Sequence, residues 1–309
     1  MAVASTDAAF RCELRSRSGG RVPSMDRMLR TPRAPLLAAL AALVGLALTG
    51  VLAYLVPLAR ARDSATLMGF TELNRPRLTP LIDQIAHLAD PVPYALIGVG
   101  LAVVALLRRR PRIAVAIIAL LALTGWTTQA LKPLLATPRY DEWLGSGQIA
   151  AASWPSGHAT AAMTLALCAI LAVPARARPT AAAVGAVFAV SVSYAILALG
   201  WHFPSDVLGG FLVATTWTLL AVAGLNWLEQ HRPSGLAREA PSRPADALVP
   251  LALGAGAAAV VLAVWLARPD QVERYAADHS TFVAGAAAIA ALAVALVLGL
   301  ARGVRSASS

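Results

Sequence analysis

The sequence holds few charged residues, few cysteines and almost no lysine. Charged residues make up 14% of the 309 residues, whereas soluble domains carry about 25%, so an ordinary soluble domain is excluded. The two cysteines, Cys12 and Cys168, lie in a polar tail and inside an apolar run, which excludes a disulfide framework and a cysteine metal site. Lys132 is the one lysine among 26 basic residues, so a compact ammonium group stands alone against an arginine background.

The net positive charge does not by itself indicate a nucleic-acid-binding protein. The net charge is +10, but the arginines lie in short runs between apolar stretches rather than on one patch, as membrane topology signals do. We therefore expect no nucleic-acid partner. The sequence contains no phosphate-binding glycine loop, zinc-ligand spacing or paired-carboxylate metal site, so we expect no cofactor and no metal.

Long apolar runs dominate the rest of the chain. Each is close to the roughly 20 residues that a spanning helix needs, and none alternates as the strands of a membrane barrel do. The sequence therefore predicts an all-α, polytopic helical membrane protein. The expected spans are 35–58, 91–107, 112–130, 157–174, 180–199, 206–227, 246–267 and 281–300.

These spans divide the chain into four parts. The first apolar run is longer than the roughly 7–15 residues of a cleavable signal, so we interpret it as a permanent span. The expected parts are a disordered basic cytoplasmic tail (1–33), a six-helix membrane core (34–228), a cytoplasmic linker (229–245) and two additional transmembrane helices with a short tail (246–309).

The distribution of basic residues predicts the orientation, because cytoplasmic loops carry an excess of Lys and Arg. With the N-terminus inside, 18 of the 26 basic residues lie inside, and both termini are cytoplasmic. The other eight are Arg60, Arg62, Arg75, Arg77, Lys132, Arg139, Arg268 and Arg274.

Three polar motifs then fall on the outer face. The first is the basic pair Lys132 and Arg139 after the third expected span. Two cations can neutralise a phosphate dianion and stabilise the charge on its equatorial oxygens. A pair that reaches to the lipid headgroups would also explain these residues, and only the neighbouring motifs favour a phosphate site.

The second motif is Pro155-Ser156-Gly157-His158 at the start of the fourth expected span. Gly157 lets backbone N–H groups approach an oxyanion closely, and Ser156 adds a hydroxyl donor. Ser156 also suits a helix N-cap, and the two roles are compatible. His158 would face water, where it can donate a proton to a leaving group; a neutral surface histidine is the plainer alternative.

The third motif is His202 with Asp206 four positions later, at the start of the sixth expected span. A carboxylate that accepts from one ring nitrogen leaves the other nitrogen free to attack phosphorus. Asp206 could instead be only a helix cap. Another outer histidine, His87, lies beside Asp83 and Asp90, and we expect it on an interfacial helix rather than in catalysis.

Together the motifs resemble the type 2 phosphatidic acid phosphatase family, also called lipid phosphate phosphatases, which is related to bacterial acid phosphatases and vanadium haloperoxidases. The family pattern is Lys-x6-Arg-Pro, then Pro-Ser-Gly-His, then Ser-Arg-x5-His-x3-Asp. The resemblance covers roughly 35–227, and the last two spans lie outside it.

The chain departs from the family pattern in two places. Tyr140 replaces the proline of the first block, and Ala195-Ile196 replace the Ser-Arg of the third. The second phosphate-binding arginine of the family is therefore absent. Either another cation supplies it, with Arg75 and Arg77 in the outer 59–90 segment as the candidates, or phosphate is bound more weakly, or activity is lost.

The resemblance implies a lipid phosphatase of the cytoplasmic membrane whose site faces outside and needs no metal. Polyprenyl diphosphate, phosphatidic acid and similar lipids all fit as substrates, and the lipid bilayer is its other partner. In this scheme His202 forms a phosphohistidine, Asp206 orients it, and His158 serves as acid and then base. The phosphoryl oxygens would be held by Lys132, Arg139, Ser156 and Gly157.

Two other functions stay open at this point. The same fold could transfer the phosphoryl group to a hydroxyl acceptor instead of water, or the chain could be a non-catalytic membrane protein with a decayed site, which Ile196 favours. Small residues in the last two spans suit close helix packing or a subunit contact, so the sequence allows a homo-oligomer.

Overall fold

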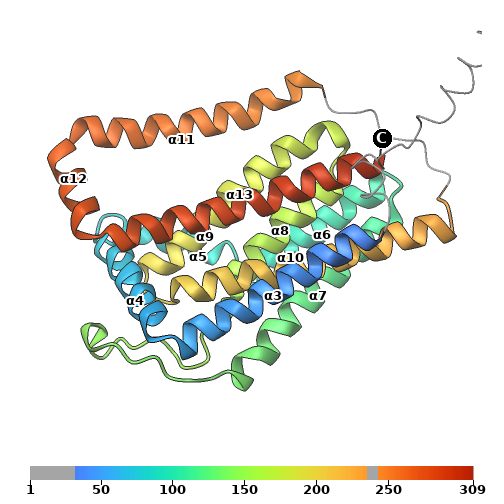
Figure 1. Cartoon of the computed structure of the whole chain (residues 1–309). Coiled ribbons are helices and arrows are strands. Elements are labelled where there is room, and N and C mark those ends of the chain that lie inside the picture. Colours follow the sequence, from blue (N-terminus) through green and yellow to red (C-terminus); the bar gives the residue numbers. More distant parts are fainter. Residues whose placement is uncertain (1–31, 235–242, 309) are drawn as a thin grey trace, which may run out of the picture.

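The computed structural model describes residues 32–234 and 243–308, and its regular elements are all helices (Figure 1). Most of the expected tail and about half of the expected linker lie outside the described residues. The elements are α3 (Arg33–Leu55), α4 (Pro57–Glu72), α5 (Thr79–His87), α6 (Pro91–Leu107), α7 (Pro111–Leu134), η1 (Glu142–Leu144), α8 (Gly157–Ala172), η2 (Ala175–Ala177), α9 (Arg178–Ala198), α10 (Pro204–His231), η3 (Pro244–Ala247), α11 (Leu248–Ala267), α12 (Pro269–Asp278) and α13 (Ser280–Ser308).

The all-α membrane architecture is confirmed. Six helical segments in the described part of the chain are long and apolar enough to cross a bilayer: α3, α7, η2–α9, α10, α11 and α13. The second expected span falls on α6, which passes as a membrane span only together with α5, from which it is bent by 52°. The fourth falls on α8, which has 16 residues and is shorter than a typical span. Figure 1 places the start of α3 and the C-terminus at the same end of the bundle.

The short helix α8 lies at the centre of the bundle. Of its 16 residues 13 are buried, against α9 and α10 above all. Alanine and glycine allow this close packing: a Cβ on Gly185 of α9 would lie 2.8 Å from the Cβ of Ala166 of α8. Because its neighbours cover it, α8 does not need the length of a lipid-facing helix.

One end of the bundle, away from the C-terminus, gathers the irregular parts of the chain (Figure 1). It holds α4, the connection from α4 to α5, the loop 135–156 and the turn between α9 and α10. We call it the site end. The N-termini of α8 and α10 both lie there, with the positive ends of their backbone dipoles.

The last helices differ in how they join this core. None of the α11 residues is buried, and α11 lies at the edge of the bundle in Figure 1, where it contacts α9. By contrast, α13 packs on α4 and α9. The Tyr194 hydroxyl donates to the carbonyl of Ala286 at 2.7 Å, and the Thr66 hydroxyl to that of Thr281 at 3.1 Å. The extension therefore braces α4, which forms one wall of the site end.

Candidate active site

The turn before α8 is held against the start of α10. Ser156 is the N-cap of α8, and its Oγ accepts from the N–H of Ala159 at 3.3 Å. Its own N–H donates to the Asp206 carbonyl at 2.9 Å. Gly210 makes this approach feasible, because a Cβ there would lie 2.7 Å from the Ser156 carbonyl oxygen. The capping role predicted for Ser156 is confirmed, and its hydroxyl hydrogen remains available.

Lys132 reaches the same turn from the C-terminal end of α7. Its Nζ would lie 3.9 Å from a Cβ at Gly157, and its ammonium is close enough to interact electrostatically with Asp206 and His158. The lysine that stands alone in the sequence thus lies beside the first N–H groups of α8. An ammonium and a helix N-terminus at one point form a site for an anion.

His202 and Asp206 meet as their spacing predicts. The His202 Nδ1 lies 3.3 Å from the Asp206 Oδ2, which also accepts from the Phe203 N–H at 3.0 Å. Gly200, with φ of +70°, starts the turn in a conformation that favours glycine. Asp206 therefore caps α10 and orients the histidine, and the Nε2 of His202 is the nitrogen left for chemistry.

Arg139 lies on the far side of Asp206 from His202. Its guanidinium donates to Asp206 and, at 2.7 Å, to the hydroxyl of Ser153. Its other terminal nitrogen lies 3.0 Å from the Ser205 Oγ and 3.4 Å from the Asp63 Oδ2. The Arg139 side chain is only 6% exposed. A buried charge needs compensation, which the carboxylates of Asp63 and Asp206 supply. Here Arg139 supports Asp206 directly.

Asp63 of α4 is a site residue that the sequence did not reveal. Its carboxylate accepts from the Ser205 N–H at 2.8 Å and from the Ser205 Oγ at 2.6 Å, at the start of α10. Burial, with a smaller contribution from Asp206, raises the pKa of Asp63 to about 6. Asp63 and Ser205 are 142 positions apart, so no local pattern could pair them.

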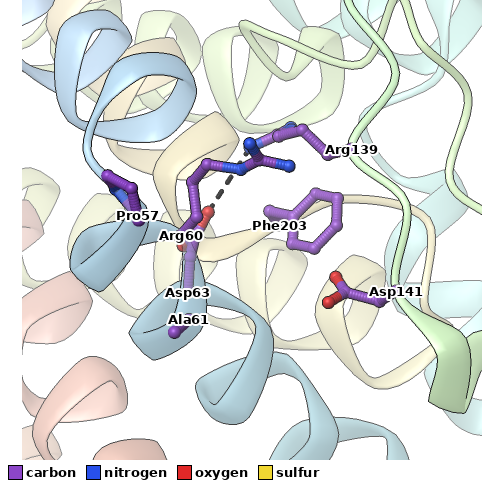
Figure 2. A pocket seen from close by; sticks show the side chains of 7 residues that line it. All are labelled: Pro57, Arg60, Ala61, Asp63, Arg139, Asp141 and Phe203. Carbon is purple, nitrogen blue, oxygen red and sulfur yellow. Dashed lines mark hydrogen bonds and ion pairs between the residues drawn. The ribbon is translucent and has the colours of Figure 1, made fainter.

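A cavity of about 240 Å³ opens beside Arg139, and Figure 2 shows its lining side chains. Arg60 extends into it from α4 toward Arg139. Arg75 and Arg77 are exposed on the connection between α4 and α5, and within the described residues neither lines this cavity. The lining residues are Pro57, Arg60, Ala61, Asp63, Arg139, Asp141 and Phe203.

His158 faces His202 across the site, with the two ring centres 6.4 Å apart. Its Nε2 lies 3.0 Å from the Asp90 Oδ1, and its ring packs on Trp201 at 5.5 Å. His87 also packs on Trp201, at 5.6 Å, and its Nε2 lies 4.0 Å from the Asp90 Oδ2. The sequence placed Asp90 beside His87 only, and its contact with His158 becomes visible in the fold.

The site end therefore combines two histidines, a fixed lysine and two helix N-termini. Within residues 32–234 and 243–308, no group of three or more His, Cys, Asp or Glu side chains could hold a metal ion. Ile196, at the position of the missing arginine, is fully buried in the hydrophobic core. The arrangement can bind an oxyanion, present a nucleophilic imidazole and supply a proton from the opposite side.

Comparison with known proteins finds a family model that matches part of the chain. Residues 113–230 match the model of the PAP2 superfamily, and this range contains all seven predicted site residues. The chain is also similar to the crystal structure of "the first transmembrane PAP2 type phosphatidylglycerolphosphate phosphatase from Bacillus subtilis", with a TM-score of 0.44 and 19% identity, over 64% of this chain and 98% of that chain. No curated protein matches the sequence.

Proposed function

We propose that the protein is a membrane phosphatase that hydrolyses a lipid phosphate or diphosphate, as the match of residues 113–230 to the PAP2 superfamily model supports. One observation carries the proposal: the free Nε2 of the His202–Asp206 pair and the ring of His158 face each other beside Lys132 and the start of α8. A phosphoryl group held there would have a nucleophile on one side and an acid on the other.

The reaction would proceed in two displacements. In the first, the Nε2 of His202 forms a bond to phosphorus, the bond to the lipid oxygen breaks, and protonated His158 gives its proton to that oxygen. In the second, His158 takes a proton from water as the water oxygen bonds to phosphorus, and the N–P bond breaks. Both histidines return to their starting states, and the products are phosphate and the lipid alcohol, or phosphate and the lipid monophosphate when the substrate is a diphosphate.

The phosphoryl oxygens would be bound by Lys132, by the Ser156 hydroxyl and by the N–H of Gly157. Arg139 would join them by exchanging one of its partners, and its 3.4 Å contact with Asp63 is the longest of the four. Arg60 lies in the cavity beside Arg139. We propose it, rather than Arg75 or Arg77, as the cation that offsets the loss of arginine at position 196.

The substrate would enter from the lipid at headgroup depth. Two of the helices that bear site residues, α7 and α10, are also long enough to span the bilayer, so their ends at the site lie near the membrane surface. The basic residues favour the outer surface for this end. Water and a phosphate headgroup can meet there, while the lipid chains stay in the bilayer.

The test is phosphate release by purified protein in detergent, with a chelator present, across polyprenyl diphosphate, phosphatidic acid and phosphatidylglycerol phosphate. We expect release that persists with chelator and disappears in His202→Ala. His231→Ala is the matched control, because His231 is exposed at the last residue of α10, distant from the site, and it should retain full activity.

The outcomes separate the alternatives. Release that requires an added hydroxyl acceptor would indicate a phosphotransferase. No release from any of these lipids by the folded wild-type protein would refute the proposal and favour a non-catalytic role, with Ile196 as the reason.

A further inference from the structure

We infer that Asp90 is a positioning residue for His158, and that the site therefore works with two histidine–carboxylate pairs rather than one. The inference rests on the proposed function for its catalytic meaning. Its structural basis is the contact of 3.0 Å between the Asp90 Oδ1 and the His158 Nε2, which joins the start of α6 to the start of α8.

The local sequence shows why Asp90 is available for this contact. Asp90 is the N-cap of α6, a position where aspartate normally accepts from the N–H of the second or third helical residue. Here the first and third helical residues are Pro91 and Pro93, which have no N–H. Within the described part of the chain, the Asp90 side chain makes no capping bond. The carboxylate is therefore directed to another helix.

The charges around His158 give this carboxylate a function. Burial is the main factor that lowers the pKa of His158; His202 from the turn before α10 and Lys132 from α7 lower it further, whereas Asp90 raises it. His87, with Asp83 at 3.5 Å, contacts Trp201, and its Nε2 lies 4.0 Å from the Asp90 Oδ2. His158 must be protonated to act first as an acid, and Asp90 counters the burial and the neighbouring groups that oppose this.

The contact also selects the reacting nitrogen. A carboxylate partner at Nε2 keeps that nitrogen protonated, so Nδ1 is the atom that gives its proton to the leaving oxygen and later accepts one from water. Asp90 itself keeps its charge throughout and takes no proton. Exposure of the side chain falls from 36% for Asp90 to 25% for His158 and 9% for His202, so the pair lies at the wet entrance of the site.

The first test uses leaving groups of different quality. An alkyl phosphate needs protonation of its leaving oxygen, whereas p-nitrophenolate departs without it. In Asp90→Asn we expect release of the alcohol in the first turnover to slow about tenfold, part of the 10²- to 10⁴-fold that general acid catalysis supplies. Release of p-nitrophenol should slow less than about threefold. A purely structural role would slow both equally.

Asp83→Asn is the matched control, because Asp83 is also acidic, exposed and close to His87. It should leave both rates unchanged. Equal losses on the two substrates in Asp90→Asn, or no loss on either, would overturn the inference.

A second readout does not depend on turnover. With ring-labelled histidine and His158→Gln for assignment, NMR should show the His158 ring titrating at lower pH in Asp90→Asn than in wild type. An unchanged titration would refute the positioning role even if the enzyme is active. If the wild-type protein releases no phosphate, the proposed function fails, and the NMR shift still decides whether Asp90 controls His158.

Discussion

The two histidine–carboxylate pairs at the site end differ in depth and in origin. His202 and Asp206 are four positions apart on one turn and almost fully buried, with side chains 9% and 0% exposed. His158 and Asp90 are 68 positions apart, on different helices, and partly open to water. The buried pair suits a nucleophile that needs a fixed orientation. The open pair suits an acid and base that exchanges protons with the leaving group and with water.

The largest effect should come from breaking the buried pair. Asp206→Asn removes the carboxylate that orients His202 and leaves the charge of Arg139 with less compensation. We expect kcat to fall on the order of 10⁴-fold, as when a triad carboxylate is replaced, and the free energy of unfolding to fall by about 3 kcal/mol. Steady-state kinetics and thermal unfolding in detergent would measure these. A kcat loss smaller than that of Asp90→Asn would reverse the ranking of the two pairs.

The next prediction concerns the close contact between α8 and α10, which holds the two pairs at their distance from each other. Gly210→Ala places a methyl group 2.7 Å from the Ser156 carbonyl oxygen, so α8 and its His158 must move away from α10 and its Asp206. We expect a loss in kcat of about tenfold and destabilisation of about 1–3 kcal/mol. Gly224→Ala, on the same helix with nothing within 4 Å of the new Cβ, is the control and should change neither quantity appreciably. Equal kcat values and equal stabilities for the two variants would show that the close contact between α8 and α10 does not determine the geometry of the site.

The pH dependence of stability tests the role of Asp63, which contacts Arg139 next to the buried pair. The pKa of Asp63 is raised to about 6 from its usual 3.8, so the folded protein binds a proton more tightly than the unfolded chain. Stability must then fall as pH rises from about 4 to about 6, by roughly 2–3 kcal/mol in total. Asp63→Asn should remove that part of the slope. The measurement is the difference between wild-type and variant unfolding free energies from pH 4 to pH 7, and a difference that does not vary with pH would contradict the assignment.

The smallest effect concerns the cation proposed to replace the missing arginine. Arg60→Gln should raise KM for a lipid phosphate about three- to tenfold with kcat nearly unchanged, since an exposed cation contributes little more than about 1 kcal/mol. Arg62→Gln is the control, because Arg62 lies on the same helix and does not line the cavity within the described structure. Equal KM values for the two variants would show that Arg60 does not replace the arginine that is missing at position 196.

Much of the fold could be predicted because its signals are local in sequence. Continuous apolar runs indicate membrane helices, and the six long segments confirm the class. The exception is instructive: α8 meets the hydropathy pattern of a span, yet with 16 residues it is a short central helix. Its small residues pack against neighbouring helices, and burial by protein cannot be distinguished from burial by lipid in the sequence of one helix.

The candidate site likewise combines contacts that are local in sequence with contacts between distant segments. The spacing of His202 and Asp206 determines their contact, because a short turn that leads into the first residues of α10 joins them. The sequence also determined that Ser156 would cap α8 beside Gly157. Only the tertiary structure decided that Arg139 contacts Asp206 and Asp63 and that His158 contacts a carboxylate from another helix. These partners are 67 to 76 positions apart, and helix packing, rather than any local pattern, sets which of the acidic side chains reaches each cation or histidine.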